Sequence, residues 1–128
     1  MSDWKTPLRL VEQLDKKGNI HEKGVKKLVS AVAEASELGE KLGCAEFIAF
    51  ATSAVRSAPN SEAVLDEVEK QTGVRLQILS GVEEAQLTFL AARRWYGWSA
   101  GRITNLDIGG GSLELSTGTD EHPDLAFS

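Results

Sequence analysis

Short apolar runs alternate with amphipathic segments between residues 45 and 97, and this alternation constrains the fold more than any other feature. Residues 45–51 are almost continuously apolar, which is typical of a buried strand. Residues 74–78 alternate apolar and polar side chains, the period of two that predicts a strand with one less buried face. Helical spacing of apolar residues predicts helices over 20–43, 59–73 and 80–97. Strands joined by helical crossovers predict a parallel sheet with helices packed on it, an α/β fold.

Local signals refine this prediction. The apolar cluster at 8–11 predicts a first strand, and the polar stretch 52–57 predicts a loop. Asn60 or Ser61 is expected to cap the second helix, and Gly73 lies just past its end. Ser80 and Glu83 have the S-x-x-E spacing of a capping box, which predicts the start of the third helix.

The alternation of strand and helix patterns ends at Gly101. Residues 103–108 and the alternating Leu113 and Leu115 predict two strands joined by a turn of three glycines, which is a hairpin. A polar loop follows, and residues 125–127 are expected to open a third strand.

Charge and cysteine content exclude several classes of protein. The 128 residues contain 14 Lys and Arg against 19 Asp and Glu, a formal net charge of −5, which disfavours general nucleic-acid binding. The single cysteine, Cys44, excludes an intrachain disulfide and a zinc site built on several thiolates. No apolar signal region opens the sequence and no run approaches the ~18 apolar residues of a membrane span. We therefore expect a cytoplasmic protein with neither a nucleic acid nor a membrane as partner.

The stretch from Asp107 to Ser112 is the most informative for chemistry. Its three glycines, Gly109, Gly110 and Gly111, leave backbone N–H groups open to an anion, so the loop can wrap a phosphate. It is not followed by a helix, as the dinucleotide fingerprint requires, and it lacks the Gly-Lys-Ser/Thr ending of a P-loop. A flexible hairpin turn remains the alternative.

Acidic residues surround this loop and a helix start. Asp107 and Glu114 can hold a divalent cation, and Mg²⁺ suits a site of few carboxylates plus substrate phosphate; two solvated carboxylates are the alternative. Glu83 has the capping role, whereas Glu84 in the same first turn is favoured in its ionised form by the helix dipole and can accept a proton from water. Glu84 as a plain dipole complement is the alternative.

Basic and imidazole side chains give weaker signals. Arg56 follows a predicted strand in a hydroxyl-rich loop, where an arginine can bind phosphate oxygens. The alternative is a surface arginine without a binding role. Arg93 and Arg94 lie beside aromatic residues at the end of the third predicted helix, where helix capping and core packing are favoured over base stacking. His21 and His122 have no third potential metal ligand nearby in the sequence, so neither indicates a metal site or a catalytic base.

Three segments together resemble the exopolyphosphatase/guanosine pentaphosphate phosphatase family. They are 51–56 (Ala-Thr-Ser-Ala-Val-Arg), 80–85 (Ser-Gly-Val-Glu-Glu-Ala) and 107–114 (Asp-Ile-Gly-Gly-Gly-Ser-Leu-Glu), and their order and spacing match the family. The stretch 94–102 resembles actinobacterial members. The resemblance implies a ribonuclease-H-like (actin-like) fold of the sugar-kinase superfamily, with a mixed sheet and flanking helices.

The resemblance also implies roles for individual residues. Glu84 matches the acid that activates the attacking water, Arg56 matches a phosphate-contacting arginine, and Gly109, Gly110, Gly111 and Ser112 match the second phosphate loop. Asp107 and Glu114 match acidic residues near the magnesium and phosphate site. The implied reaction releases terminal orthophosphate from inorganic polyphosphate, with water as the nucleophile. Hydrolysis of guanosine pentaphosphate by the same residues, or a phosphate- or nucleotide-binding module without turnover, are the alternatives.

One departure from the family pattern bears on the size of the protein. Family members begin with a strand that carries Asp-x-Gly-Ser-Asn and continue well beyond the second phosphate loop, whereas this sequence has neither feature. The resemblance therefore implies a fragment, with residues 1–98 from a first actin-like domain and 99–128 opening a second. We expect the isolated chain to self-associate through exposed sheet edges and to have negligible phosphatase activity.

Overall fold

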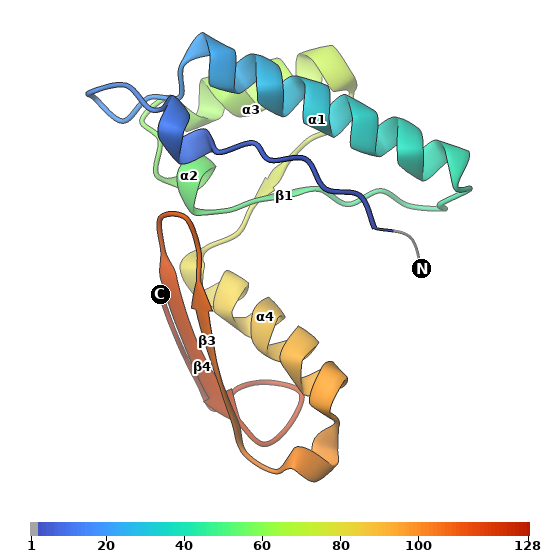
Figure 1. Ribbon diagram of the computed structural model, residues 1–128, viewed down its shortest axis with the longest axis vertical. Coiled ribbons are helices and arrows are strands. Elements are labelled where there is room, and N and C mark those ends of the chain that lie inside the picture. The colour runs from blue at the N-terminus through green and yellow to red at the C-terminus, as the bar shows by residue number, and fades with distance from the viewer. Residues whose placement is uncertain (1–2) are drawn as a thin grey trace. The chain divides into compact units, whose positions relative to one another are not determined.

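The computed structural model describes residues 3–128, and they divide into two compact units (Figure 1). One unit ends at Ile78 and the other comprises Leu79–Ser128. The expected domain boundary near residue 98 refers to the domains of a longer protein, which this division does not test, so it stays a prediction.

The first unit is built from two long helices over a small parallel sheet. It contains η1 (Leu10–Gln13), α1 (Glu22–Lys41), β1 (Phe50–Ala51), α2 (Ser53–Arg56), α3 (Ser61–Thr72) and β2 (Gln77–Ile78). The helix α1 packs against α3, and β1 pairs in parallel with β2. Both long helices and the parallel pairing are as predicted. Their apolar faces form one core, made mainly by Leu28, Val32, Val55, Val64, Leu65, Val68 and Leu76.

A single side chain joins the starts of α1 and α3. The Asn60 amide accepts a hydrogen bond from the Ile20 N–H at 2.9 Å and donates one to the Ile20 carbonyl oxygen at 3.0 Å. Asn60 occupies the N-cap position of α3 as expected, but its side chain makes no capping bond. The backbone of the buried Ile20 uses the amide instead, because an unpaired buried peptide group is costly.

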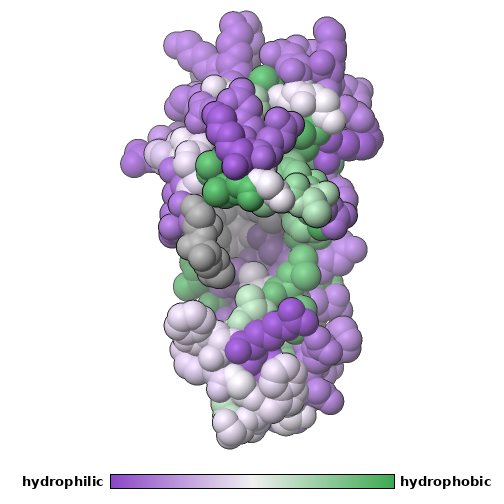
Figure 2. Space-filling model, turned by 90° about the vertical axis from the view of Figure 1, so that its right-hand side faces the viewer, coloured by the Kyte–Doolittle hydropathy of each residue, from purple (hydrophilic) through white to green (hydrophobic). Residues whose placement is uncertain are grey.

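Three local predictions in this unit are wrong, and the strand predicted over 74–78 is shortened to Gln77–Ile78. Residues 8–11 form no strand; a 3₁₀ helix begins at Leu10. The strand predicted over 45–51 is reduced to Phe50–Ala51, and Phe47, Ile48 and Phe50 are exposed. The strand is short because, among the described residues, β2 pairs with Phe50 and Ala51 alone in this segment. Figure 2 shows hydrophobic patches among hydrophilic side chains on the face that it views.

The third wrong prediction is the loop over 52–57. Its residues form the short helix α2, in which the Thr52 carbonyl oxygen accepts hydrogen bonds from the N–H groups of Val55 and Arg56, both at 3.0 Å. Val55 is buried in the core, so packing of one apolar side chain favours the helical turn over an extended loop.

The second unit is a helix packed on a three-stranded antiparallel sheet. It contains α4 (Gly81–Tyr96), η2 (Trp98–Ala100), β3 (Ile103–Ile108), β4 (Leu113–Gly118) and β5 (Leu125–Phe127), with the strand order β3-β4-β5. The predicted hairpin and third strand are confirmed, and so is the capping box: Ser80 Oγ accepts from the Glu83 N–H, and the Glu83 carboxylate accepts from the Ser80 N–H.

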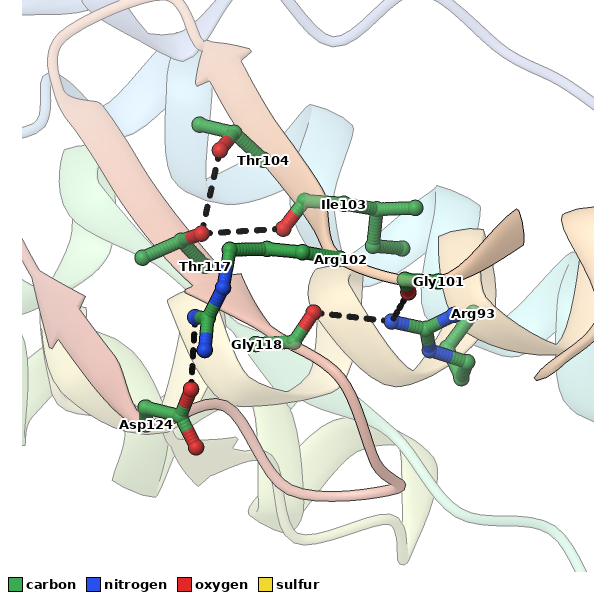
Figure 3. A network of polar contacts seen from close by, with 8 residues as sticks. All are labelled: Arg93, Gly101, Arg102, Ile103, Thr104, Thr117, Gly118 and Asp124. Carbon is green, nitrogen blue, oxygen red and sulfur yellow. Dashed lines mark hydrogen bonds and ion pairs between the residues drawn. The ribbon is translucent and has the colours of Figure 1, made fainter. Parts of the chain in front are cut away.

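Arg93 organises the far end of this unit (Figure 3). Its side chain is fully buried and donates to the carbonyl oxygens of Gly97, Gly101 and Gly118, at 3.3, 2.8 and 2.8 Å. The guanidinium also lies 5.6 Å from the centre of the Phe89 ring, which is close enough for a cation–π contact. The structural role expected for this arginine is confirmed, although its partners lie beyond its own helix as well as within the cap.

No helix within residues 3–128 is long and apolar enough to cross a membrane.

Candidate functional site

The sheet of the second unit has its charged side chains on the face that α4 covers. Asp107 of β3 lies directly opposite Glu114 of β4, and Asn105 lies opposite Ser116 in the same antiparallel register. Glu114 and Ser116 are each 1% exposed, whereas Leu113 and Leu115 on the other face of β4 are exposed. The inner face of the hairpin is therefore polar.

One hydrogen bond sets the alignment of α4 with this polar face. Asn105 Nδ2 donates to Thr88 Oγ1 at 3.3 Å, and the Thr88 hydroxyl donates to the carbonyl oxygen of Glu84 at 3.1 Å. Because α4 and β3 run side by side in opposite directions (Figure 1), Glu84, one helical turn before Thr88, lies toward the same end as Asp107, two residues after Asn105. The glycine loop follows Asp107 at that end.

Glu83 and Glu84 have separate roles in the first turn of α4. Hydrogen bonds from the Ser80 hydroxyl and from the Ser80 N–H lower the pKa of Glu83 below its usual value, so its carboxylate is committed to the capping box. Glu84 is half-buried, and its backbone N–H donates to the Ser80 carbonyl oxygen at 2.9 Å. The carboxylate of Glu84 is thus left outside the capping box and near the end of the unit that holds the loop.

The glycine loop closes on itself and buries one hydroxyl. The Gly109 N–H donates to the Ser112 carbonyl oxygen at 3.1 Å, and a Cβ added at Gly109 would lie 3.4 Å from Ser112 Oγ. That oxygen is buried without a hydrogen-bond partner among the described residues, although buried hydroxyls are normally paired. Gly109, Gly110 and Gly111 are themselves exposed, so the loop presents backbone to solvent and an unsatisfied hydroxyl beneath it.

The facing pair Asp107 and Glu114 has the donor set of a hard divalent cation. Like charges directly opposite each other in a sheet are destabilising, and burial of a carboxylate without compensation is costly. Glu114 Oε1 accepts from the Ser128 hydroxyl at 3.2 Å, while Glu114 Oε2 is buried with no partner among the described residues. Oxygen ligands of this kind suit Mg²⁺, so the residues present fit such an ion. The alternative of two solvated carboxylates is wrong for Glu114.

Arg56 lies in the first unit. It is the last residue of α2, half-buried, and follows the carboxyl end of β1. The structure therefore places Glu84, Asp107, Ser112 and Glu114 in one unit and toward the same end of it, and it places Arg56 only relative to residues before Ile78.

Sequence reasoning missed three polar residues of the site: Thr88, Asn105 and Ser116. The signal for the last two was present, because Asn105 and Ser116 share the strand period of two with Asp107 and Glu114. Thr88 lies one turn after Glu84 on α4, and its role became visible only through its bond to Asn105.

Known proteins are similar to this chain over its whole length. The Ppx/GppA phosphatase family model matches residues 1–128. The chain is 60% identical over its whole length to "Exopolyphosphatase 1" of Mycobacterium leprae and 59% identical to "Exopolyphosphatase 1" of Mycobacterium tuberculosis. It spans 38% and 37% of those two proteins, so it corresponds to little more than a third of their length.

Solved structures show the same fold. A crystal structure of an exopolyphosphatase from Cytophaga hutchinsonii matches 99% of this chain with a TM-score of 0.90 at 24% identity, over 41% of that protein's chain. The crystal structure of the Aquifex aeolicus member of the Ppx/GppA family matches 94% of this chain, over 39% of its own, with a TM-score of 0.79 at 22% identity. The actin-like α/β fold implied by the resemblance is confirmed as a partial one. The chain belongs to the Ppx/GppA phosphatase family.

Proposed function

We propose that the protein to which this segment belongs hydrolyses phosphoanhydride bonds and releases terminal orthophosphate from inorganic polyphosphate. One observation carries the proposal: the second unit gathers an acid outside the capping box, a glycine loop over an unsatisfied hydroxyl, and two facing carboxylates with a buried orphan oxygen. A phosphate chain with a bound cation satisfies all three. The names of the mycobacterial relatives support polyphosphate as the substrate.

Phosphate binding and proton transfer are assigned to different residues. The backbone N–H groups of Gly110 and Gly111 and the hydroxyl of Ser112 bind the oxygens of the terminal phosphate, which carry the negative charge. The Gly109 N–H holds the loop closed through the Ser112 carbonyl oxygen. Arg56 can offer a planar fork of donors to a phosphate, and its part in this reaction stays a prediction because it lies in the first unit. Glu84 accepts a proton from water as the water oxygen bonds to the terminal phosphorus, and the bridging P–O bond breaks to release the shortened chain.

Asp107 and Glu114 would hold Mg²⁺. When bound there, the ion supplies positive charge that offsets the charge on the transferring phosphoryl group. The buried position of Glu114 favours one well-defined ligand geometry, because its side chain is held by the Ser128 hydroxyl on one oxygen.

We also propose guanosine pentaphosphate as a second substrate candidate, because the family is named for both activities and the same residues bind either terminal phosphate. Self-association through exposed sheet edges is proposed as well. A reducing, cytoplasmic location fits Cys44, a free and exposed thiol.

The test is a chimera, because the chain spans little more than a third of its relatives. Residues 1–128 replace the matching segment of the Mycobacterium tuberculosis Exopolyphosphatase 1, to which they are 59% identical. Orthophosphate release is then measured from polyphosphate and from guanosine pentaphosphate with Mg²⁺ present. The parent protein and the isolated 128-residue chain are assayed alongside.

Faster release from polyphosphate than from guanosine pentaphosphate by the chimera supports the proposal. Faster release from guanosine pentaphosphate would make that nucleotide, and not polyphosphate, the substrate. A folded chimera that binds polyphosphate without turnover would favour a binding module. Turnover by the isolated chain at the rate of the chimera would show that Asp-x-Gly-Ser-Asn is dispensable.

A further inference from the structure

Thr88 and Asn105 form a hydrogen bond between α4 and β3 that the proposed reaction does not use. Asn105 Nδ2 donates to Thr88 Oγ1 at 3.3 Å. The Thr88 hydroxyl donates its own proton within the helix, to the carbonyl oxygens of Glu84 and Ala85 at 3.1 and 3.2 Å. Because a hydroxyl has one proton and two acceptor lone pairs, the link has a fixed direction, from the strand amide through Thr88 to the backbone of Glu84.

This link connects two residues that the proposed reaction needs in a fixed relation. At the strand end, Asn105 shares the inner face of β3 with Asp107, because alternate residues of a strand point to the same side. At the helix end, Thr88 bonds to the carbonyl oxygen of Glu84 one turn earlier. The link therefore ties the backbone of Glu84 to the strand that carries Asp107 and leads into the glycine loop.

Apolar packing alone would leave the start of α4 free to shift on the sheet. Ala85 and Phe89 are fully buried on this helix, but apolar contacts are non-directional. The directional bonds from Arg93 hold the far end of α4, and Glu84 lies nine residues before it, about 14 Å along the helix axis. A tilt of about 4° about Arg93 would therefore move Glu84 by about 1 Å, a misplacement that can lower a rate about 10²-fold.

The two residue types support a role beyond the stability of their own elements. Threonine has a low helix propensity, and a hydroxyl bonded to the carbonyl one turn back slightly destabilises a helix. Asparagine is depleted in strands. Thr88 and Asn105 are both half-buried, where apolar side chains would pack better, so what they contribute is the bond between them.

We propose that Thr88 and Asn105 are positioning residues for Glu84, an inference that rests on the proposed function. Their bond holds the first turn of α4 where the Glu84 carboxylate can reach the water that attacks the terminal phosphate. Catalytic groups must be held within about 0.5 Å of their productive geometry, and a directional bond supplies this accuracy. The phosphate-binding donors lie on the glycine loop after β3, so loss of the bond should lower kcat and leave substrate binding nearly unchanged.

The chimera with the Mycobacterium tuberculosis protein tests the proposal through kcat and KM for orthophosphate release from polyphosphate. Thr88→Val removes the hydroxyl with little change of shape, and kcat should fall about tenfold while KM changes by less than about twofold. Asn105→Leu removes the same bond from the strand side and should give the same fall. The double variant should fall no further, because both changes remove one interaction. Thr88→Ser keeps the hydroxyl and should keep kcat near the native value.

Glu84→Gln separates positioning from a general loss of structure. In that background Thr88→Val should lower kcat by less than about twofold, because the group that it positions no longer acts. A structural role alone would lower kcat by the same factor in both backgrounds. Thr72→Val in α3 is the matched control: Thr72 Oγ1 donates to the Val68 carbonyl oxygen at 2.7 Å, also one turn back, but accepts from the Val74 N–H. It should lower stability and leave kcat per folded molecule unchanged.

Three results with an active chimera would overturn this inference alone. They are an unchanged kcat in both Thr88→Val and Asn105→Leu, an equal loss of kcat in Thr88→Ser, and an equal fall from Thr88→Val with and without Glu84. A chimera that releases no orthophosphate would overturn the proposed function, and this inference with it.

Discussion

Arg93 and Gly118 are joined across 25 residues of sequence by a hydrogen bond of 2.8 Å from Arg93 Nη2 to the Gly118 carbonyl oxygen. The same nitrogen lies 2.8 Å from the carbonyl oxygen of Gly101. One buried guanidinium therefore ties the end of α4 to the segment before β3 and to the end of β4. This holds the helix against the sheet at the end opposite the candidate site.

Replacing this arginine should destabilise the second unit. Arg93→Met would leave the carbonyl oxygens of Gly101 and Gly118 without their donor, and we expect a loss of about 2–4 kcal/mol in the free energy of unfolding. Urea unfolding followed by tryptophan fluorescence measures it, because Trp98 of this unit donates its indole N–H to Asp120 in the folded state. Arg94→Met is the control: its ion pair with Glu121 is exposed, so the expected loss is at most about 1 kcal/mol. Equal losses in the two variants would contradict this account.

Gly118 should not accept a side chain. A Cβ there would lie 2.9 Å from Pro123 Cα and 3.0 Å from the Asp124 nitrogen, both backbone atoms that cannot rotate away. Gly118→Ala should cost about 1–3 kcal/mol from overpacking. Gly39→Ala within α1 is the control, because its Cβ would lie 3.5 Å from Phe47 Cδ2 and helix propensity favours alanine by about 0.5–1 kcal/mol. A neutral Gly118→Ala would show that the loop before β5 moves freely.

The capping box should make stability depend on acid. Because the folded-state pKa of Glu83 is lowered by its bonds from Ser80, its contribution is present above the unfolded pKa of about 4.3 and is lost as the pH falls through the folded value. The melting temperature of Glu83→Gln should therefore lie below that of the native chain at pH 7, and the gap should narrow below about pH 4.3. Ser80→Ala removes the cap itself and should cost about 1 kcal/mol. A gap that widens in acid would have the wrong sign for this mechanism.

Neighbouring glutamates should separate catalysis from folding. In the chimera, Glu84→Gln should lower the turnover of polyphosphate by about 10²-fold or more, the usual contribution of a general base, while polyphosphate affinity survives. Glu83→Gln should lower stability and leave turnover per folded molecule within a small factor. Unchanged turnover in Glu84→Gln would remove that residue from the mechanism.

The facing carboxylates should respond to Mg²⁺. An ion that binds the folded state raises the melting temperature by mass action, so Mg²⁺ should stabilise the native chain and should have little effect on Asp107→Asn. Without Mg²⁺, Asp107→Asn should be no less stable than the native chain, because it removes a like-charge contact with Glu114. Asp66→Asn on the exposed side of α3 is the control and should keep the full Mg²⁺ response. The same response in both variants would place the ion elsewhere.

The sequence by itself determined what is local and periodic. The helices α1, α3 and α4, the hairpin around the glycine loop and the capping box of Ser80 and Glu83 all depend on residues within a few positions of one another, so spacing alone predicted them. The chemistry of Glu84, Asp107, Ser112 and Glu114 came from three motifs whose order and spacing resemble a family.

Tertiary structure decided what depends on contacts between distant residues. Composition made 45–51 look buried, yet Phe47, Ile48 and Phe50 are exposed because burial depends on which elements pack over a segment. The stretch 52–57 is helical because Val55 packs into the core. Asn60 bonds to Ile20 rather than capping its own helix. Ser112 and Glu114 each have a buried oxygen without a hydrogen-bond partner among the described residues. A hydrogen bond from Asn105 to Thr88 aligns α4 with the strands that carry them. Both features depend on the packing of helix against sheet, because burial and hydrogen-bond geometry are properties of the assembled fold.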